Sequence, residues 1–244
     1  KMVTARAFRE SDRVKLFTMV SPKLSKFLGR DFTMNAGVIL PKDWRDDPAQ
    51  HYPTLYWIGG FSGDHHSAGQ MARMLGSIPG ADRCLIVVPD PTCYRGHSVF
   101  ADSETNGPWG AALVQDLIPA IEAKYHGSGT AEHRFVSGIS SGGWSSLWLQ
   151  VAYPDAFNGV WSHCPDPVDF HDFQQIDLYA TDANMYKDAA GQRRPLARNG
   201  ETVMLWYDDF VRQETVMGAG GQIHSFEAVF SPRDAKGQPR PLFD

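Results

Sequence analysis

Short apolar runs recur along the first two thirds of the chain and predict the strands of a sheet. They span residues 32–40, 54–58, 84–88, 133–139 and 158–164. The first run alternates apolar and polar residues, which predicts an edge or half-exposed strand. The second (TLYWI) and the third (CLIVV) are almost continuously apolar, as is typical of parallel strands that helices cover on both faces.

Helical patterns lie between these runs. A segment from Pro108 to Tyr125 repeats apolar residues every four positions, at Trp109, Leu113, Leu117 and Ile121. This spacing predicts a helix with one apolar face; Pro108 suits its first turn, and Pro119 should kink it because proline has no backbone N–H to donate. A second helix is expected in WSSLWLQVAY, after residue 143. The alternation predicts a three-layer α/β fold with a mainly parallel sheet and right-handed crossovers.

The pattern weakens after about residue 165. Residues 200–214 fit either a short helix or a strand in their first half, and residues 225–230 (SFEAVF) alternate like a strand. No repeat or linker-like composition divides the chain. We therefore expect one domain over residues 1–244, in which residues 165–244 form an insertion or lid-like segment and the final strands are missing.

Composition excludes several classes of protein. The chain has 244 residues, of which 42% are apolar, and it carries 23 Lys plus Arg against 28 Asp plus Glu without a basic block. These values favour a folded soluble protein and argue against a nucleic-acid partner. No apolar run approaches the length of a membrane helix. Three cysteines allow at most one disulfide, and Cys93 and Cys164 are the pair that could meet.

The sharpest chemical signal is GISSGG, residues 138–143, between a strand-like run and a helix-like one. In a G-x-S-x-G nucleophile elbow, the serine occupies a strained strand-to-helix turn, and the flanking glycines let the backbone segments cross closely. Ser140 is the predicted nucleophile, because Ser141 has no glycine two positions before it. A Gly/Ser-rich turn without chemistry is the alternative, and the flanking strand and helix argue against it.

A second glycine-rich loop, GGFSG at residues 59–63, follows the predicted strand 54–58. In α/β-hydrolases the loop after this strand supplies one backbone N–H of the oxyanion hole, and the residue after the nucleophile supplies the other. We expect the amides of Phe61 and Ser141 in these two roles. A tight turn with no further function is the alternative for the loop.

Taken in order, the GGFSG loop, the helix from Pro108, the segment HRFVSGISSGGW and YPDAF resemble the putative-esterase family of α/β-hydrolases, over roughly residues 30–165. This family includes enterochelin-esterase-like proteins, S-formylglutathione hydrolases, feruloyl and acetylxylan esterases, and mycolyltransferases. The resemblance implies an α/β-hydrolase fold, a serine nucleophile, an ester substrate and no cofactor. The chain has Ile58-Gly59-Gly60 where many relatives have a His-Gly pair, which a backbone donor tolerates.

A serine nucleophile needs a histidine base and an acid, and this fold supplies them downstream in the order Ser, Asp or Glu, His. His163 and His171 follow Ser140 too early to occupy the final loop. We expect the acid and the histidine beyond Asp244, in a later segment or a second chain that completes the fold. One alternative is an acid and a base within the chain, Asp209 (or Asp208) with His224, which follow Ser140 in the required order but are too close in sequence for a helix and a strand between them. The other alternative is an inactive relative.

His65 and His66 beside Asp64 suggest a metal site, but adjacent histidines point in different directions on a helix or strand, and no second cluster completes a ligand set. We therefore expect no metal here and interpret the segment as a polar loop near the mouth of the active site. Cys84 falls in a core strand and is interpreted as a small buried hydrophobic residue.

The predicted function is hydrolysis of a carboxylic ester through an acyl-enzyme on Ser140. An acyltransferase of the same fold, in which an alcohol replaces water, is one alternative, and a non-catalytic binding domain is another. The expected substrate is a small-molecule or carbohydrate-linked ester. Because enterochelin-esterase-like relatives are often exported and the sequence begins at Lys1, we expect a periplasmic or extracellular protein, with a cytoplasmic one as the alternative.

Overall fold

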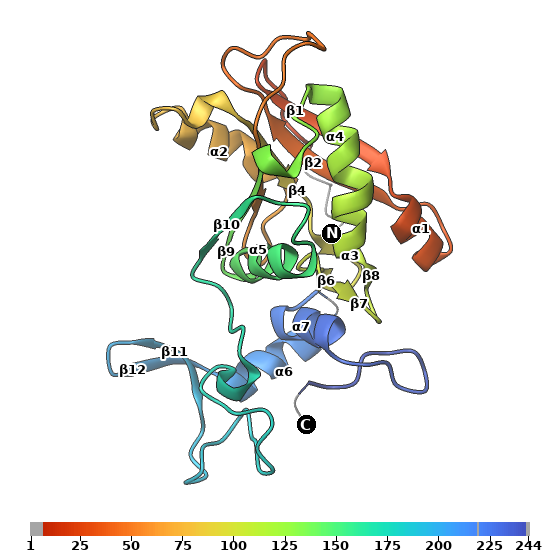
Figure 1. Ribbon diagram of the computed structural model, residues 1–244. Coiled ribbons are helices and arrows are strands. Elements are labelled where there is room, and N and C mark those ends of the chain that lie inside the picture. Colours follow the sequence, from red (N-terminus) through yellow and green to blue (C-terminus); the bar gives the residue numbers. More distant parts are fainter. Residues whose placement is uncertain (1–6, 219, 243–244) are drawn as a thin grey trace.

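A six-stranded mixed sheet forms the centre of the molecule in the computed structural model, which describes residues 7–218 and 220–242. Its strand order is β1-β2-β4-β3-β9-β10 (Figure 1). The strands β4, β3, β9 and β10 run parallel, whereas β1 and β2 are antiparallel to their neighbours. The bounds of the six strands are β1 Val14–Val20, β2 Thr33–Ile39, β3 Thr54–Ile58, β4 Leu85–Pro89, β9 Arg134–Ile139 and β10 Gly159–His163.

All five predicted strands of the first two thirds are confirmed to within a residue or two. The expectation that the run at 32–40 is an edge or half-exposed strand is wrong, because β2 lies between β1 and β4 and its last four residues are buried. The edge position belongs to β1, which the sequence analysis did not predict and which pairs with β2 along its whole length. The opposite edge is β10, which pairs only with β9 among the described residues.

Helices cover both faces of the sheet, as the three-layer prediction requires. Buried side chains of the helix after Pro108 pack with those of β2, β3, β4 and β9 in one large cluster, and Leu149 joins them. On the other face, Met71 and Leu75 pack against Val14, Ile39, Ile86 and Val88. The helices are α1 Pro22–Leu28, α2 Ala68–Leu75, α3 Trp109–Ala112, α4 Ile118–Tyr125, α5 Ser141–Ala152, α6 Tyr207–Met217 and α7 Gln222–Phe230.

The kink predicted at Pro119 takes the form of a wide turn. Residues Leu113–Leu117 form a π-helical segment between α3 and α4, and Pro119 lies in the first turn of α4. A proline at this position cannot donate to the carbonyl four residues earlier, and a π turn is one way for a helix to re-pair its backbone.

The remaining elements are short. The 3₁₀ turns are η1 His65–Ser67, η2 Ala81–Arg83, η4 Ala131–His133 and η5 Phe170–Asp172. Three two-stranded sheets are formed by β5 Thr92–Cys93 with β6 Gly96–His97, by β7 Asp102–Ser103 with β8 Gly107–Pro108, and by β11 Pro195–Asn199 with β12 Thr202–Trp206.

The C-terminal region, residues 165–218 and 220–242, lies beyond the end of the sheet where the chain leaves β10, with α7 nearest to it (Figure 1). Of the two alternatives for residues 200–214, the strand followed by a helix is correct. The strand predicted at 225–230 is wrong, because this segment lies in α7. Its buried apolar residues Ile223, Phe226 and Val229 recur every three positions and so follow a helical rather than a strand period.

Two further sequence observations are settled by the described residues. None of the helices at 7–218 and 220–242 combines the length and the hydrophobicity needed to cross a membrane. All three cysteines are free thiols, so the possible bridge between Cys93 and Cys164 is not formed.

Candidate active site

Ser140 occupies the sharp turn between β9 and α5. Its backbone angles are φ 56° and ψ −124°, and α5 begins at the next residue. A positive φ is uncommon for a residue with a side chain, and strained positions of this kind cluster at functional sites. The conformation is the one that the G-x-S-x-G pattern predicts.

The glycines around Ser140 are required by close backbone contacts. A Cβ atom on Gly138 would lie 2.1 Å from the carbonyl oxygen of Gly142, and one on Gly142 would lie 2.1 Å from that of Ile58. Real Cβ atoms do not approach backbone this closely, so β3, β9 and the start of α5 can meet only where side chains are absent.

Backbone hydrogen bonds hold the turn against β10. The Ser140 N–H donates to the carbonyl oxygen of His163 at 3.0 Å, and the Ser140 carbonyl accepts from Trp144 at 3.0 Å and from Asp166 at 3.3 Å. The strained residue is thus fixed from both the helix and the segment after β10.

The GGFSG loop lies against this turn, although it is about eighty residues away in sequence. A Cβ atom on Gly60 would lie 3.3 Å from Ser140 Cβ and 3.8 Å from Ser140 Oγ. The loop is closed by a hydrogen bond from the Gly63 N–H to the Gly60 carbonyl at 2.8 Å. Within residues 7–218 and 220–242, no hydrogen bond joins the amide N–H of Phe61 or of Ser141 to a protein acceptor.

Asp166 is a neighbour of Ser140 that the sequence analysis missed. The hydroxyl of Ser140 donates to Asp166 Oδ1 at 3.4 Å, and Oδ2 of the same carboxylate is buried. Burial raises the pKa of Asp166, and the hydroxyls of Ser141 and Ser140 oppose this rise. The only sequence signal was an acidic residue just after a strand at the carboxyl edge of the sheet.

His97 is a second residue that the sequence analysis missed. It is buried behind the GGFSG loop, with its ring centroid 6.3 Å from that of Phe61, and its Nδ1 accepts from the Val99 N–H at 3.0 Å. Burial lowers the pKa of His97 to about 4, although the charge of Asp90 and a hydrogen bond to Gly59 act in the opposite direction. The imidazole is therefore neutral at neutral pH.

The structure pairs the predicted alternatives for acid and base with other groups. Asp208 and Asp209 bind Arg193, with nearest distances of 2.5 and 2.7 Å, and His224 Nδ1 lies 3.9 Å from Glu214 Oε2. No hydrogen bond or ion pair in the described residues joins Asp209 to His224, or either of them to Ser140. His163 meets Ser140 only through its backbone carbonyl.

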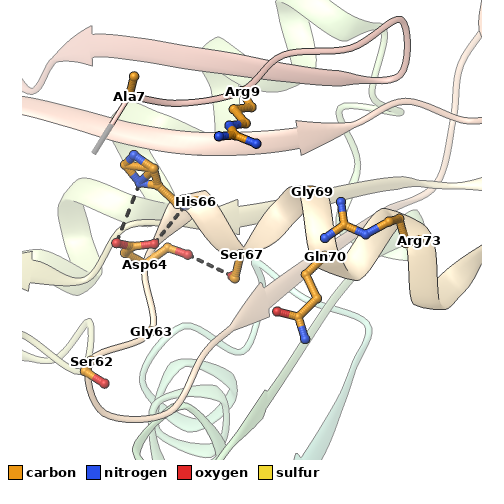
Figure 2. Close-up of a pocket in the computed structure, with 10 residues that line it drawn as sticks. All are labelled: Ala7, Arg9, Ser62, Gly63, Asp64, His66, Ser67, Gly69, Gln70 and Arg73. Carbon is orange, nitrogen blue, oxygen red and sulfur yellow. Dashed lines mark hydrogen bonds and ion pairs between the residues drawn. The ribbon is translucent and has the colours of Figure 1, made fainter. Parts of the chain in front are cut away.

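Two hollows lie near this edge of the sheet. The smaller, about 70 Å³, is lined by Asp166 and by aromatic side chains of the C-terminal region, among them Phe173, Tyr207 and Phe226. The larger, about 560 Å³, opens above α2 and is lined by Asp64, His66 and two arginines, but not by Ser140 (Figure 2). The smaller hollow is the one that reaches a contact of the predicted nucleophile.

Comparison with known families gives one clear match. The family described as "Putative esterase" matches residues 25–222, most of the chain. Esterase Rv1288 of Mycobacterium tuberculosis is 26% identical over 159 residues, which is 63% of this chain and 34% of that protein. Dipeptidyl-peptidase 5 of Aspergillus fumigatus is 25% identical over 126 residues, which is 51% of this chain and 17% of that protein. The chain thus spans about a third or less of the length of these curated relatives.

One solved structure supports the fold. The fluorophosphonate-binding serine hydrolase FphF of Staphylococcus aureus superimposes with a TM-score of 0.52 at 16% identity, over 69% of this chain and 62% of that one. A CE1 ferulic acid esterase of the anaerobic fungus Anaeromyces mucronatus gives a TM-score of 0.48 at 18% identity, over 67% of this chain and 63% of that one. The likeness to FphF confirms the predicted α/β-hydrolase fold.

Proposed function

Since the chain belongs to the putative-esterase family, we propose that it forms the nucleophile-bearing part of a serine esterase, with Ser140 as the nucleophile. The observation that carries this proposal is the strained conformation of Ser140 between β9 and α5, with the glycine-rich loop packed against it. A nucleophile elbow requires this strand–turn–helix setting.

In the proposed reaction, Ser140 Oγ attacks the acyl carbon of the ester and forms a tetrahedral oxyanion. The amides of Phe61 and Ser141 donate to this oxyanion, and α5 adds the positive end of its dipole. The alcohol then leaves, and water releases the acyl group from Ser140. Loss of the Ser140 proton requires a base, and the prediction that the histidine and its acid come from beyond Asp244 stays a prediction.

The family supports a proposal for the class of substrate. We propose a small-molecule or carbohydrate-linked ester, with the C-terminal region shaping the acyl pocket at the hollow beside Asp166. A periplasmic or extracellular location fits such a substrate and remains part of the proposal.

The decisive experiment uses the complete protein and a fluorophosphonate probe. We expect covalent labelling that peptide mass spectrometry locates on Ser140, and Ser140→Ala should lose the label and nearly all hydrolysis of a p-nitrophenyl ester. Loss of a triad nucleophile lowers activity by orders of magnitude. A Ser140→Ala variant that keeps a tenth of the wild-type activity would contradict the proposal.

Ser141→Ala is the matched control, because it changes a neighbouring serine whose proposed role rests on its backbone. This variant should keep activity within about tenfold of wild type, far above that of Ser140→Ala.

Product analysis with added acceptor alcohols separates hydrolysis from acyl transfer. In crystals of the phosphonylated protein, a phosphonyl oxygen more than about 3.5 Å from both amide nitrogens would disprove the oxyanion roles.

A further inference from the structure

Three metal-ligating side chains meet on the turn that follows the GGFSG loop. Asp64 caps the 3₁₀ turn η1, its Oδ1 accepting from the His66 N–H at 2.9 Å. One ligand atom from each of Asp64, His65 and His66 lies within 4.8 Å of those of the other two, and the two imidazole rings lie 4.2 Å apart, centroid to centroid. The expectation that these adjacent histidines point in different directions is therefore wrong.

Asp90, which follows β4, orients one of the rings. His65 Nδ1 lies 2.8 Å from Asp90 Oδ2, and both side chains are largely buried. A neutral imidazole that donates its Nδ1–H to this carboxylate carries its lone pair on Nε2, the atom that can then bind a metal. This carboxylate–histidine pairing is the usual outer shell of a zinc site.

The other two groups face an open approach. His66 Nδ1 lies 3.6 Å from Asp64 Oδ2, and both residues line the larger hollow (Figure 2). The side chain of Asp64 is 40% exposed, so an ion can reach it from solvent. Arg9 and Arg73 line the same hollow and oppose a cation, while Asp64 and Asp90 supply two negative charges that favour it.

We propose that Asp64, His65 and His66 form a binding site for a divalent transition metal, with zinc as the best fit and Asp90 as the orienting outer-shell residue. Two imidazoles and one carboxylate are a typical zinc ligand set, to which water adds the fourth position. Imidazole donors select zinc, nickel and cobalt over calcium and magnesium. Zinc–ligand bonds of about 2.0 to 2.1 Å place the ligand atoms of a tetrahedral site about 3.4 Å apart. Side-chain rotations that shift the three ligand atoms by about an ångström therefore close the site.

Bound metal would fix the position of the turn that follows the candidate oxyanion loop. The three ligands begin one residue after Gly63, and Asp90 extends from the neighbouring strand β4. Phe8 covers the cluster, with its ring stacked on His65 at 5.6 Å and an angle of 9°. The metal site does not depend on Ser140 being the nucleophile, because none of the contacts described for the site involves Ser140.

The test measures zinc bound by the complete protein after equilibrium dialysis, together with visible absorption of the cobalt form. We expect His66→Ala to bind one equivalent of zinc fewer than wild type and to lose the tetrahedral cobalt bands. Asp90→Asn should keep the site but weaken zinc binding by about 10- to 100-fold, as outer-shell changes do. Zinc should raise the melting temperature of wild type more than that of His66→Ala.

His171→Ala is the matched control. Like His66, His171 donates its N–H to an aspartate that caps a 3₁₀ turn, and its Nδ1 lies 3.1 Å from Asp177, but its turn holds no second histidine. This variant should bind as much zinc as wild type. Equal zinc in wild type and His66→Ala, with equal melting temperatures in chelator to show that both fold, would overturn the site. Unchanged affinity in Asp90→Asn would overturn the orienting role.

Discussion

The sheet with its helices and the C-terminal region are held together by different kinds of contact. In the first, one continuous cluster of buried side chains runs through five strands and the helix after Pro108, and a buried ion pair joins Arg134 to Glu122 at 2.6 Å. In the second, a small cluster around Phe173 and Tyr207 stands apart, and the ion pairs around Arg193 are exposed. Ser140 therefore stands on the densely packed part, while the hollow beside it is lined largely from the sparsely packed part.

The junction between the two regions combines apolar and polar contacts. Val99 and Ala101 form one small buried cluster with Phe226 and Val229 of α7. Ser225 Oγ of α7 lies 3.1 Å from the Arg95 carbonyl oxygen and accepts from the His97 N–H at 3.2 Å. Ser103 Oγ donates to the Ala228 carbonyl at 3.1 Å. A catalytic residue needs a fixed position, whereas a region that selects substrates tolerates variation, and the two kinds of packing suit these two tasks.

The largest effect is expected where backbones cross at the elbow. Gly142→Ala places a Cβ atom 2.1 Å from the Ile58 carbonyl oxygen, and neither backbone segment can move without disturbing the sheet. We expect a loss of about 4 kcal/mol or more in the free energy of unfolding. Urea denaturation measures it.

Gly69→Ala is the control for that substitution, because its Cβ would meet only the end of the Arg73 side chain at 4.0 Å within α2. This change at a half-buried helical position should stabilise the protein slightly, by about 0.5 to 1 kcal/mol. Equal stability of the two variants would mean that the elbow backbone is not closely packed.

The buried ion pair is the next test of the packed region. Arg134→Met leaves the Glu122 carboxylate buried, with only the Tyr56 hydroxyl at 3.4 Å as a remaining side-chain partner. Removing one member of a buried pair costs about 3 to 5 kcal/mol. Urea denaturation at pH 7 should show this loss, and a change below about 1 kcal/mol would refute the importance of the pair.

The junction itself should respond to pH through His97. The folded protein keeps this ring neutral down to about pH 4, whereas the unfolded chain takes up a proton near pH 6.5. Stability from His97 is therefore fully present above pH 6.5 and is lost as the pH falls to about 4, for a total of about 3 kcal/mol. Unfolding free energies of wild type and His97→Gln at pH 7 and pH 4.5 measure it; the same pH dependence in both proteins would exclude His97 as the cause.

The smallest effect is expected in the C-terminal region. Arg193 holds Asp208 and Asp209 in an exposed network, and their attraction is screened by solvent. Arg193→Met should leave the urea midpoint unchanged within error. A loss like that of Arg134→Met would show that the C-terminal region is as firmly held as the sheet.

The same contrast explains what the sequence could predict. Strands such as β3 and β4 lie in the middle of the sheet. Because both of their faces are covered, their sequences are almost continuously apolar, and this pattern can be recognised. The edge strand β1 carries Lys15 and Thr18 among its apolar residues and was missed. The segment SFEAVF alternates over six residues, too few to separate a strand from the helix that it forms.

The candidate site was predictable only where local pattern fixes geometry. The elbow motif placed Ser140 because its glycines serve contacts within one strand–turn–helix unit. Asp166 reaches Ser140 through the path of the chain after β10, and the His65–Asp90 pair joins two different strand ends. Contacts of this kind depend on tertiary arrangement, which no spacing in the sequence records.

The free edge of β10 has a consequence for the solubility of residues 1–244 prepared alone. An edge strand offers unpaired N–H and C=O groups, and natural proteins protect such edges with lysine or proline. The other edge strand, β1, carries Lys15, whereas β10 (GVWSH) has neither residue, and its Trp161 is 56% exposed. Such a preparation should self-associate through β10 as its concentration rises, and Trp161→Lys should keep it dispersed.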